Sequence, residues 1–345
     1  MTRRDLERLA DGLGLDVLGV APAEPYEETE RHIRERRAAG LFADMRFTMA
    51  HPELSCHPER LLPGARAVVS AALCYYAPGP APRAGEGTLA RYTWRDAYAA
   101  LRLALDELGR RLGGSYRVLV DASHHVDREA AVRAGIGFYG KNTMVITRRY
   151  GSWVVLGTLV TDVEIEPTPR LSLDCGQCRL CIDACPTGAL DEPGVLDATK
   201  CLSYWTQSPR AIPEHYREEL GASAYGCDIC QEVCPWNRGI ERRRSHFVPP
   251  AEAEPTVSLL EWLRASDAAL LRRYRRLYVP RLQARYLRRN ALVALANTGS
   301  LADLPEVERY LSHPDPLLRD HAAWAAGRLR QRASEEPAGA GAQAR

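Results

Sequence analysis

The sequence of 345 residues lacks a hydrophobic segment long enough to cross a membrane. Its longest apolar run, at 68–77, has ten residues and includes a serine, whereas a membrane-spanning helix needs about 20 apolar residues. An export signal is also missing, because Asp5, Glu7 and Asp11 interrupt the first residues, MTRRDLERLADGL. We therefore expect a cytoplasmic protein that does not associate with a membrane, in which the run at 68–77 is a buried strand.

Cysteine is nearly absent outside one segment. Of ten cysteines, only Cys56 and Cys74 lie outside residues 175–234. Since the cytoplasm is reducing, clustered cysteines there are expected to bind a metal rather than to form disulfides. We expect no ligand role for Cys56 and Cys74, and Cys74, within the apolar run, is predicted to lie in the core.

Lysine is scarce as well, and the basic residues are unevenly distributed. Only Lys141 and Lys200 are lysines among 46 basic residues, and the net charge is +2. Residues 264–300 nevertheless contain nine arginines and a single acid, Asp267, a local charge of +8, with three tyrosines interleaved. This pattern attracts a phosphate backbone and offers rings for stacking on unpaired bases, although a solvated helix face is the alternative. The predicted nucleic-acid contacts are Arg272, Arg273, Arg275, Arg276, Arg281, Arg285, Arg288 and Arg289.

The length predicts two or three domains. Alternating helix and strand patterns over 1–168 predict an α/β domain around one sheet, followed by a cysteine-rich domain at 169–240. Residues 241–332 are predicted to be helical, and 333–345 to be a disordered tail. The segments 287–296 and 318–327 resemble each other, which favours a short HEAT-like repeat or an ordinary helical subdomain. The expected fold class is thus a multidomain α+β or α/β protein.

The expected elements of the first domain follow from hydrophobic periodicity. Helices are predicted at 5–15, 27–39, 97–112 and 128–134, and strands at 17–20, 67–76, 116–120, 144–147 and 153–163. The Pro/Gly-rich segment 78–87 is predicted to be a loop.

The spacing of the cysteines is specific. The first run, CxxCxxCxxxCP from Cys175 to Pro186, is that of a bacterial ferredoxin, in which three thiolates bind one 4Fe-4S cluster and the fourth binds another. With the usual crossing, the first cluster takes Cys175, Cys178, Cys181 and Cys234, and the second takes Cys185, Cys201, Cys227 and Cys230. Zinc is the alternative, but a zinc site does not require this run.

Two clusters form an electron relay and break no bonds themselves, so the chemistry is expected elsewhere. Asp121 ends a predicted strand and could donate a proton, or it could cap the next helix or turn. The adjacent His124 and His125 are predicted to face solvent or to cap a turn. The glycine-rich segment 135–142 weakly resembles an anion-binding loop that contains Lys141.

In combination, these motifs resemble the epoxyqueuosine reductases, and the resemblance covers about residues 1–330. The blocks that carry it are VDASHHVDR at 120–128, AGIGFYGKNTMVI at 134–146, CPTGAL at 185–190, CLSYWTQ at 201–207 and YGCDICQEVCPWN at 225–237.

The resemblance implies two 4Fe-4S clusters, a base-off cobalamin and a HEAT-like carboxyl-terminal domain. It implies that Asp121 is the proton donor, with Asp127 as the second candidate. The implied cobalamin contacts are Ala90, Arg91, Asp121, Val145, Leu156, Leu159, Ser203 and Asp228. Many relatives carry an Arg or Lys just before a Pro-x-x-Leu-Leu segment, where this chain has SCHP from Ser55 to Pro58. The chain also lacks the DxHxxG signature of many cobalamin proteins.

The implied activity is reduction of epoxyqueuosine to queuosine at the wobble position of the tRNA anticodon, with loss of water. The implied partners are tRNA carrying epoxyqueuosine and a soluble low-potential electron donor of the flavodoxin or ferredoxin type, and the chain is expected to be a monomer. Two alternatives are a related cobalamin-dependent reductive dehalogenase, which normally has an export signal and a tyrosine donor, and a non-catalytic ferredoxin-type electron carrier.

Overall fold

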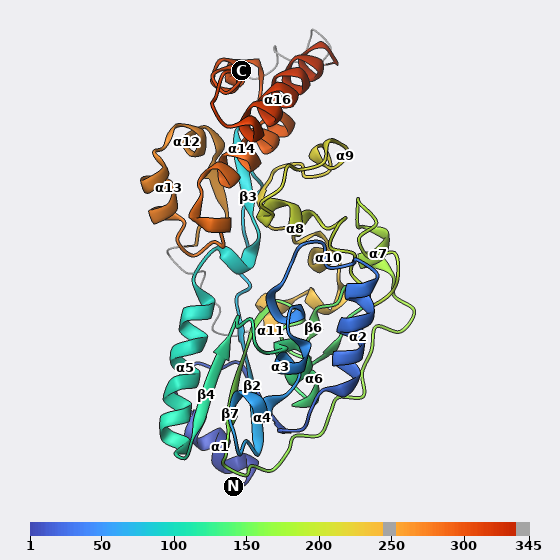
Figure 1. Cartoon of the computed structure of the whole chain (residues 1–345), viewed down its shortest axis with the longest axis vertical. Helices are drawn as coiled ribbons and strands as arrows, with labels where there is room; N and C mark the ends of the chain where they lie inside the picture. Colours follow the sequence, from blue (N-terminus) through green and yellow to red (C-terminus); the bar gives the residue numbers. More distant parts are fainter. Residues whose placement is uncertain (244–252, 336–345) are drawn as a thin grey trace. The chain divides into compact units, whose positions relative to one another are not determined.

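The computed structural model describes residues 1–243 and 253–335 (Figure 1). The chain forms two compact units. Unit 1 consists of Met1–Ala77, Arg95–Lys200 and Ile229–Pro250, and unit 2 of Pro78–Trp94, Cys201–Asp228 and Ala251–Arg345. This division differs from the three predicted domains, because the cysteine-rich segment 169–240 is shared between the units. Most of the predicted disordered tail lies outside the described residues.

Unit 1 is built on a four-stranded sheet of order β1-β2-β7-β4. The strands are β1 (Val17–Pro22), β2 (Ala67–Cys74), β7 (Val154–Thr161) and β4 (Tyr116–Val120), close to their predicted positions. All three pairings are antiparallel. Unit 1 is therefore an α+β structure, and the prediction of an α/β domain is corrected, because a period of two residues reveals a strand but not its direction.

Helices cover both faces of this sheet. On one face, α5 (Ala97–Leu112) runs alongside β4 and β7 and buries Leu101, Leu105 and Leu108 (Figure 1). Gly157 of β7 is required there, because a Cβ atom would lie 2.7 Å from Leu105 Cδ1. On the other face, α6 (Asp127–Arg133) packs on β1, β2 and β7. The remaining helical segments of this part are α1 (Arg3–Ala10), α2 (Glu27–Ala38), η1 (Phe47–Met49), α3 (Pro52–Ser55) and α4 (Pro58–Leu61).

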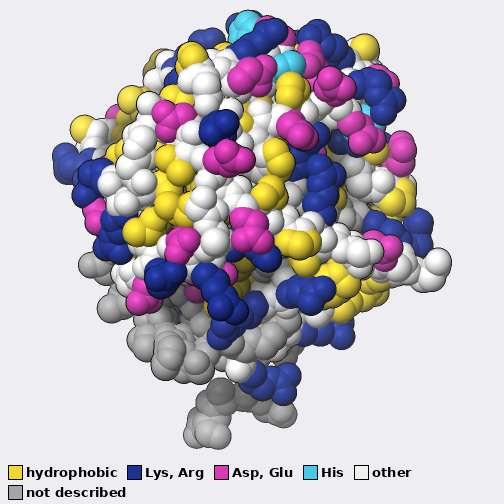
Figure 2. All heavy atoms as spheres, turned by 90° about the horizontal axis from the view of Figure 1, so that it is seen from below, with side chains coloured by type: hydrophobic (Ala, Val, Ile, Leu, Met, Phe, Trp, Pro, Cys, Tyr) yellow, Lys and Arg dark blue, Asp and Glu magenta, His cyan; other side chains and the backbone are white. Residues whose placement is uncertain are grey.

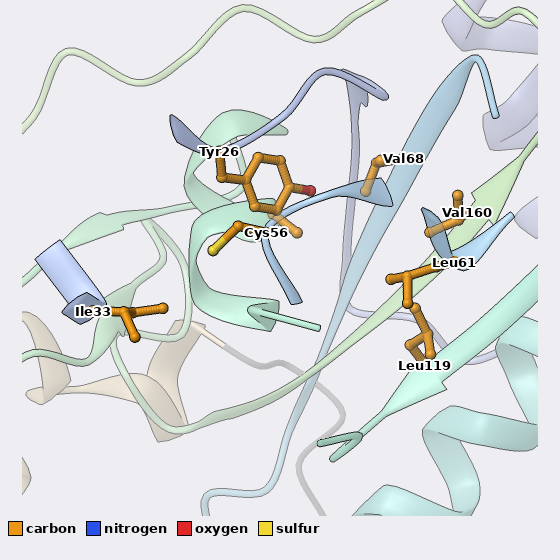
Figure 3. Packing of buried hydrophobic residues seen from close by; sticks show 8 residues of the cluster. Tyr26, Ile33, Cys56, Leu61, Val68, Leu119 and Val160 are labelled. Atoms are coloured by element: carbon orange, nitrogen blue, oxygen red, sulfur yellow. The ribbon is translucent and has the colours of Figure 1, made fainter. Parts of the chain in front are cut away.

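The core on the α6 side contains one of the two isolated cysteines. Figure 3 shows Cys56 beside the ring of Tyr26, with Leu61, Leu119 and Val160 farther along the same core. Both Cys56 and Cys74 are completely buried, as expected for Cys74. Burial raises the pKa of the Cys56 thiol to about 11, which keeps it protonated at neutral pH.

The rest of unit 1 consists of short elements. They are the hairpin β5 (Phe138–Tyr139) and β6 (Val145–Ile146), the helices α7 (Leu180–Asp183), α10 (Ile229–Glu232) and α11 (Ile240–Arg243), and η3 (Pro235–Asn237). Loops and single helical turns thus carry the cysteines, which lets thiols distant in sequence approach one another.

Unit 2 contains a three-stranded sheet of order β8-β3-β9. Strand β3 (Glu86–Leu89) pairs in parallel with β8 (Ser223–Tyr225) and antiparallel with β9 (Thr256–Ser258). Strand β3 was not predicted from the sequence, and its first residues lie in the predicted loop. Its glycine misled the prediction: Gly87 is needed because a Cβ there would lie 2.7 Å from the Cβ of Ala224.

Unit 2 is otherwise helical. Its elements are η2 (Arg91–Thr93), α8 (Leu202–Gln207), α9 (Glu214–Arg217), α12 (Leu259–Arg264), α13 (Asp267–Arg273), η4 (Pro280–Leu282), α14 (Arg285–Thr298), η5 (Leu301–Asp303), α15 (Leu304–Glu308) and α16 (Pro316–Glu335). The two similar sequence segments lie on α14 and α16, which pack against each other. Their assignment to a HEAT-like repeat stays a prediction.

Charged side chains of both signs lie interspersed over the face shown in Figure 2. Elsewhere in the described residues, ion pairs form within single helices, as between Arg34 and Glu30 of α2. Among the described residues, no helix is long and apolar enough to cross a membrane.

Candidate functional site

Four of the predicted cluster ligands surround one cavity in unit 1. The cavity has a volume of about 100 Å³ and is lined by the thiols of Cys175, Cys178, Cys181 and Cys234, together with Lys141, Asn142, Ile146, Pro235 and Trp236. These four cysteines are the set predicted for the first cluster, and the structure brings them together although Cys234 is far away in sequence. Four thiols around a common space fit a 4Fe-4S cluster.

The local structure explains how these thiols converge. Cys178 donates its backbone N–H to the carbonyl of Cys175 over 3.1 Å, and Cys181 follows on α7. Burial, and then the neighbouring thiols, raise the pKa of Cys181 and of Cys234. Because iron binds the thiolate, cluster assembly must release these protons and offset that cost.

Lys141 fixes the first cysteine loop. Its Nζ donates hydrogen bonds to the carbonyls of Gly176, over 2.7 Å, and Cys178, over 2.9 Å. Lys141 lies in the turn between β5 and β6, so part of the glycine-rich segment belongs to a hairpin, and its resemblance to an anion-binding loop stays a prediction. The scarcity of lysine drew attention to this position, but sequence alone did not show that it binds backbone carbonyls.

A second network, missed by the sequence analysis, holds the segment around Cys234. The Asn237 amide accepts from the N–H of Ser152 over 2.7 Å and donates to the carbonyl of Gln231 over 2.7 Å. Gly151 allows this approach, because a Cβ there would lie 1.9 Å from Asn237 Oδ1. Buried and fully hydrogen-bonded, the network positions one thiolate of the first set.

The other four predicted ligands are distributed over both units. Cys185 and Cys230 belong to unit 1, whereas Cys201 and Cys227 belong to unit 2. All four are partly exposed. Their assignment to the second cluster stays a prediction.

Asp121 occupies the predicted position at the end of β4. Its backbone is left-handed, with φ of 50°, which is uncommon for a residue other than glycine. Its carboxyl is exposed, yet the surrounding protein atoms raise its pKa, and nearby Arg102 opposes that shift. The N-cap of α6 is Val126 and no side chain caps this helix, so the alternative that Asp121 caps the helix is wrong.

Two further polar groups follow in the same loop. Asp127 begins α6, and its buried carboxyl lies beside the side chain of Thr158. Burial raises the pKa of Asp127 well above its ordinary value, and the charge of Asp121 adds to the shift. His124 is exposed as predicted, but His125 is fully buried, and its predicted surface position is wrong.

Four of the residues implied as cobalamin contacts lie in unit 2. Asp228 accepts the backbone N–H of Arg91 over 2.7 Å and lies 3.7 Å from the Arg91 guanidinium. Ala90 donates its N–H to the carbonyl of Tyr225. Ser203 Oγ accepts from the Gln207 amide over 3.1 Å, and Gln207 in turn accepts from the hydroxyl of Tyr225. The structure therefore connects Ala90, Arg91, Ser203 and Asp228 through one local network.

The other four implied contacts lie in unit 1. Asp121 is exposed, whereas Val145 is nearly buried. Leu156 and Leu159 are on β7, where side chains alternate between the faces of the sheet, so these two point to opposite faces. Leu159 is completely buried. A ligand on one face cannot touch both side chains, which removes the Leu159 side chain from the implied set.

Comparisons with known proteins agree with these observations. A model of a 4Fe-4S double cluster binding domain matches residues 174–237, and a model described as epoxyqueuosine reductase QueG, DUF1730, matches residues 56–127. Epoxyqueuosine reductase of Bacillus cereus is 34% identical over 342 residues, which cover 95% of this chain and 89% of the relative. That of Gloeobacter violaceus is 35% identical over 311 residues, which cover 86% of this chain and 97% of the relative. The chain belongs to the epoxyqueuosine reductase family.

Solved structures of this family show the same fold. An epoxyqueuosine reductase with an epoxyqueuosine-modified tRNA stem loop matches with a TM-score of 0.86 and 33% identity, covering 95% of this chain and 90% of that one. The enzyme from Bacillus subtilis, with a catalytic aspartate loop swung out of the active site, matches with a TM-score of 0.84 and 31% identity. The match covers 98% of this chain and 95% of that one. The chain is therefore an oxidoreductase of mixed α+β fold with a domain for two 4Fe-4S clusters.

Most arginines predicted to contact nucleic acid are engaged within this reductase. Arg273 and Arg276 both bind Glu254, over 2.9 and 2.8 Å. Arg285 pairs with Asp315 and Arg288 with Asp267. Intramolecular acids thus neutralise half of the predicted set.

Arg289 is a core residue. It is completely buried, and its guanidinium donates to the carbonyls of Trp205, Thr206, Ser208 and Arg210. The prediction that Arg289 contacts nucleic acid is therefore wrong, because its donors hold the chain that follows α8. Arg272, Arg275 and Arg281 are exposed, and within residues 1–243 and 253–335 their side chains form no ion pair.

Proposed function

We propose that this chain reduces epoxyqueuosine in tRNA to queuosine, with removal of the epoxide oxygen as water. The proposal is supported by family membership over nearly the whole chain and by the thiol cavity and carboxyl that the structure describes. Conversion of an epoxide to an alkene and water consumes two electrons and two protons. The protein must therefore deliver both.

For the electrons, Cys175, Cys178, Cys181 and Cys234 would hold the first cluster, and Lys141 and Asn237 would fix the loops that carry them. Cys185, Cys201, Cys227 and Cys230 are proposed to hold the second. A bound cobalamin would supply the reducing centre that meets the substrate. Its proposed contacts are Ala90, Arg91, Asp121, Val145, Leu156, Ser203 and Asp228.

Asp121 is the proposed proton donor. Its carboxyl is exposed to an incoming substrate, and its raised pKa favours the protonated form that can donate to a leaving oxygen. The strained backbone at Asp121 is typical of positions held for function. Because a relative's catalytic aspartate loop swings out of its active site, we propose that residues 121–126 move Asp121 in the same way.

The proposed partners follow from the same family. A relative has been crystallised with a tRNA stem loop, and Arg272, Arg275 and Arg281 are the exposed cations of unit 2 proposed to meet tRNA. We further propose a flavodoxin- or ferredoxin-type electron donor, a cytoplasmic location and a monomeric state.

The decisive experiment is anaerobic turnover. Protein reconstituted with iron, sulfide and cobalamin is mixed with epoxyqueuosine-containing tRNA and a low-potential reductant, and the digested nucleosides are identified by mass spectrometry. We expect queuosine to form, and to require cobalamin. Cys175→Ser should lower iron content and turnover, whereas the control Cys56→Ala, outside the cavity, should lower neither. Absence of queuosine from fully loaded protein would contradict the proposal.

A further inference from the structure

A strained turn projects from unit 2 between α13 and α14. Leu282 donates its N–H to the carbonyl of Val279 over 3.0 Å, which closes a β-turn with Pro280 in its second position. Arg281 and Leu282 have φ values of 51° and 52°. A positive φ at the third position of such a turn is where glycine is expected.

The backbone of this turn costs stability. A left-handed conformation is unfavourable for a residue with a Cβ atom, because that atom approaches the following carbonyl oxygen. Leucine has no polar side chain that could compensate by bonding to the backbone. Glycine at position 282 would remove the part of the strain that lies at that residue, so the structure itself does not explain why leucine is there.

The side chains of the turn are also unusually exposed. Leu282 is 75% exposed, the highest value for a large hydrophobic side chain among the described residues, and Tyr278 is 67% exposed. We call Tyr278, Arg281 and Leu282 the 278–282 ridge. Strain and apolar exposure at one site indicate that the ridge serves a binding partner.

The base of the ridge is firmly held. The Tyr278 carbonyl accepts the hydroxyl of Tyr225 over 2.8 Å, and Val279 and Pro280 are buried. The exposed side chains therefore project from a fixed backbone. A partner would meet preorganised groups and would lose little binding energy to ordering them.

The charge around the ridge is positive. Arg272, Arg275 and Arg281 are exposed, and residues 272–282 contain no acid. The intervening Arg273 and Arg276, in contrast, are paired with Glu254. The cations nearest in sequence to Tyr278 and Leu282 are thus available to an anionic partner.

We propose that the ridge is a stacking platform for an unpaired base of the tRNA anticodon loop, with Arg272, Arg275 and Arg281 contacting the adjacent phosphates. This inference rests on the proposed function and adds to it the residues that position the loop. An aromatic ring and an apolar wedge among arginines suit unpaired bases, which stack on flat or apolar surfaces. An acidic electron-donor protein would use the cations but would not need the wedge.

The test measures the affinity of the full-length protein for a tRNA anticodon stem loop at several salt concentrations. Loss of one stacked base weakens binding by about 5- to 100-fold, so we expect that loss for Tyr278→Ala and near-normal affinity for Tyr278→Phe. The slope of log affinity against log salt should not change in either variant. Arg281→Gln should instead make the slope shallower by roughly 0.7 to 0.9, because one phosphate contact is lost.

Leu282→Gly separates function from folding. Because glycine accepts the left-handed backbone, this variant should have a higher melting temperature and yet bind the stem loop several-fold more weakly. Leu103→Ala is the matched control, since Leu103 of α5 is 72% exposed in unit 1 and should affect neither measurement.

The outcomes distinguish this inference from the proposed function. If the wild type forms queuosine while Tyr278→Ala and Leu282→Gly bind the stem loop normally, the inference is overturned and the function stands. If both variants bind normally but lose only reduction by a protein donor, the ridge docks the donor and the inference is again wrong. If the wild type neither binds tRNA nor forms queuosine, the proposed function itself fails.

Discussion

Two histidines, one in each unit, are completely buried and have opposite surroundings. In unit 2, His321 Nε2 accepts the N–H of Ile212 over 3.2 Å, and its Nδ1 lies 2.7 Å from the carbonyl of Leu317. In unit 1, neither ring nitrogen of His125 has a hydrogen-bond partner among the described residues, and its nearest aromatic neighbour is Tyr26, at 5.9 Å between ring centroids. Burial lowers the pKa of each histidine to about 3.

The two histidines differ in whether their ring nitrogens are hydrogen-bonded, and we use this difference to distinguish polar groups that stabilise the fold from polar groups that are kept for function. An unpaired buried polar atom costs about 1–3 kcal/mol. Ser70 Oγ is also buried without a hydrogen-bond partner among the described residues. Ser70 lies opposite Thr158 in the register of β2 and β7, and the Thr158 side chain lies beside the carboxyl of Asp127. His125 lies in the loop that carries Asp121, and Asp127 directly follows this loop. Unit 1 therefore has an unsatisfied buried histidine in the loop of its proposed proton donor, whereas His321 stabilises unit 2 through both ring nitrogens.

The largest expected effect is a loss of turnover, and it tests whether the loop that carries Asp121 takes part in catalysis. Asp121→Asn keeps the size of the side chain but removes the acid, so turnover should fall about 10²- to 10⁴-fold. Melting temperature and iron content should stay unchanged, because the carboxyl is exposed. Turnover of epoxyqueuosine-containing tRNA is the measurement, and Asp11→Asn, at the exposed end of α1, is the control. Normal turnover by Asp121→Asn would remove this residue from the mechanism.

The next effect tests the structural role of His321. Replacement by leucine leaves the Ile212 N–H without its acceptor, so the free energy of unfolding should fall by about 2–3 kcal/mol. Urea denaturation followed by circular dichroism measures this loss. His321→Gln, whose amide can both accept and donate, should recover part of it. Equal stability of the leucine variant and the wild type would mean that these hydrogen bonds contribute nothing.

The sequence was sufficient where chemistry depends on local spacing. Four helices of unit 1 and the strands of its main sheet, the thiol set that includes Cys234, and Asp121 at the end of β4 were predicted near their observed positions. Local patterns define these features, because a period of two or 3.6 residues and a ferredoxin spacing are properties of short segments.

The sequence was insufficient for features that depend on packing between residues far apart in the chain. Sheet direction, the short strand β3 and the carbonyls bound by Lys141 depend on residues far away in the chain. Arg289 and Arg281 belong to the same basic segment, yet one is buried and the other exposed. Charge alone cannot separate them. The adjacent His124 and His125 divide in the same way, between solvent and core.

The smallest effect at neutral pH, and the sharpest test of the comparison, is His125→Phe. A phenyl ring fills a similar volume beside Tyr26 and leaves no unpaired nitrogen, so stability at pH 7 should be unchanged or slightly higher. The wild type and the His125→Phe variant are expected to differ in how much stability they lose at acidic pH. The unfolded chain protonates histidine below about pH 6.5, whereas the folded chain resists until about pH 3, so each buried histidine costs about 1.4 kcal/mol per pH unit within that window. Urea denaturation between pH 7 and 4 should therefore show a shallower loss for His125→Phe than for the wild type. A variant that is much less stable at pH 7, with an unaltered acid slope, would show that His125 has partners and that the contrast with His321 is false.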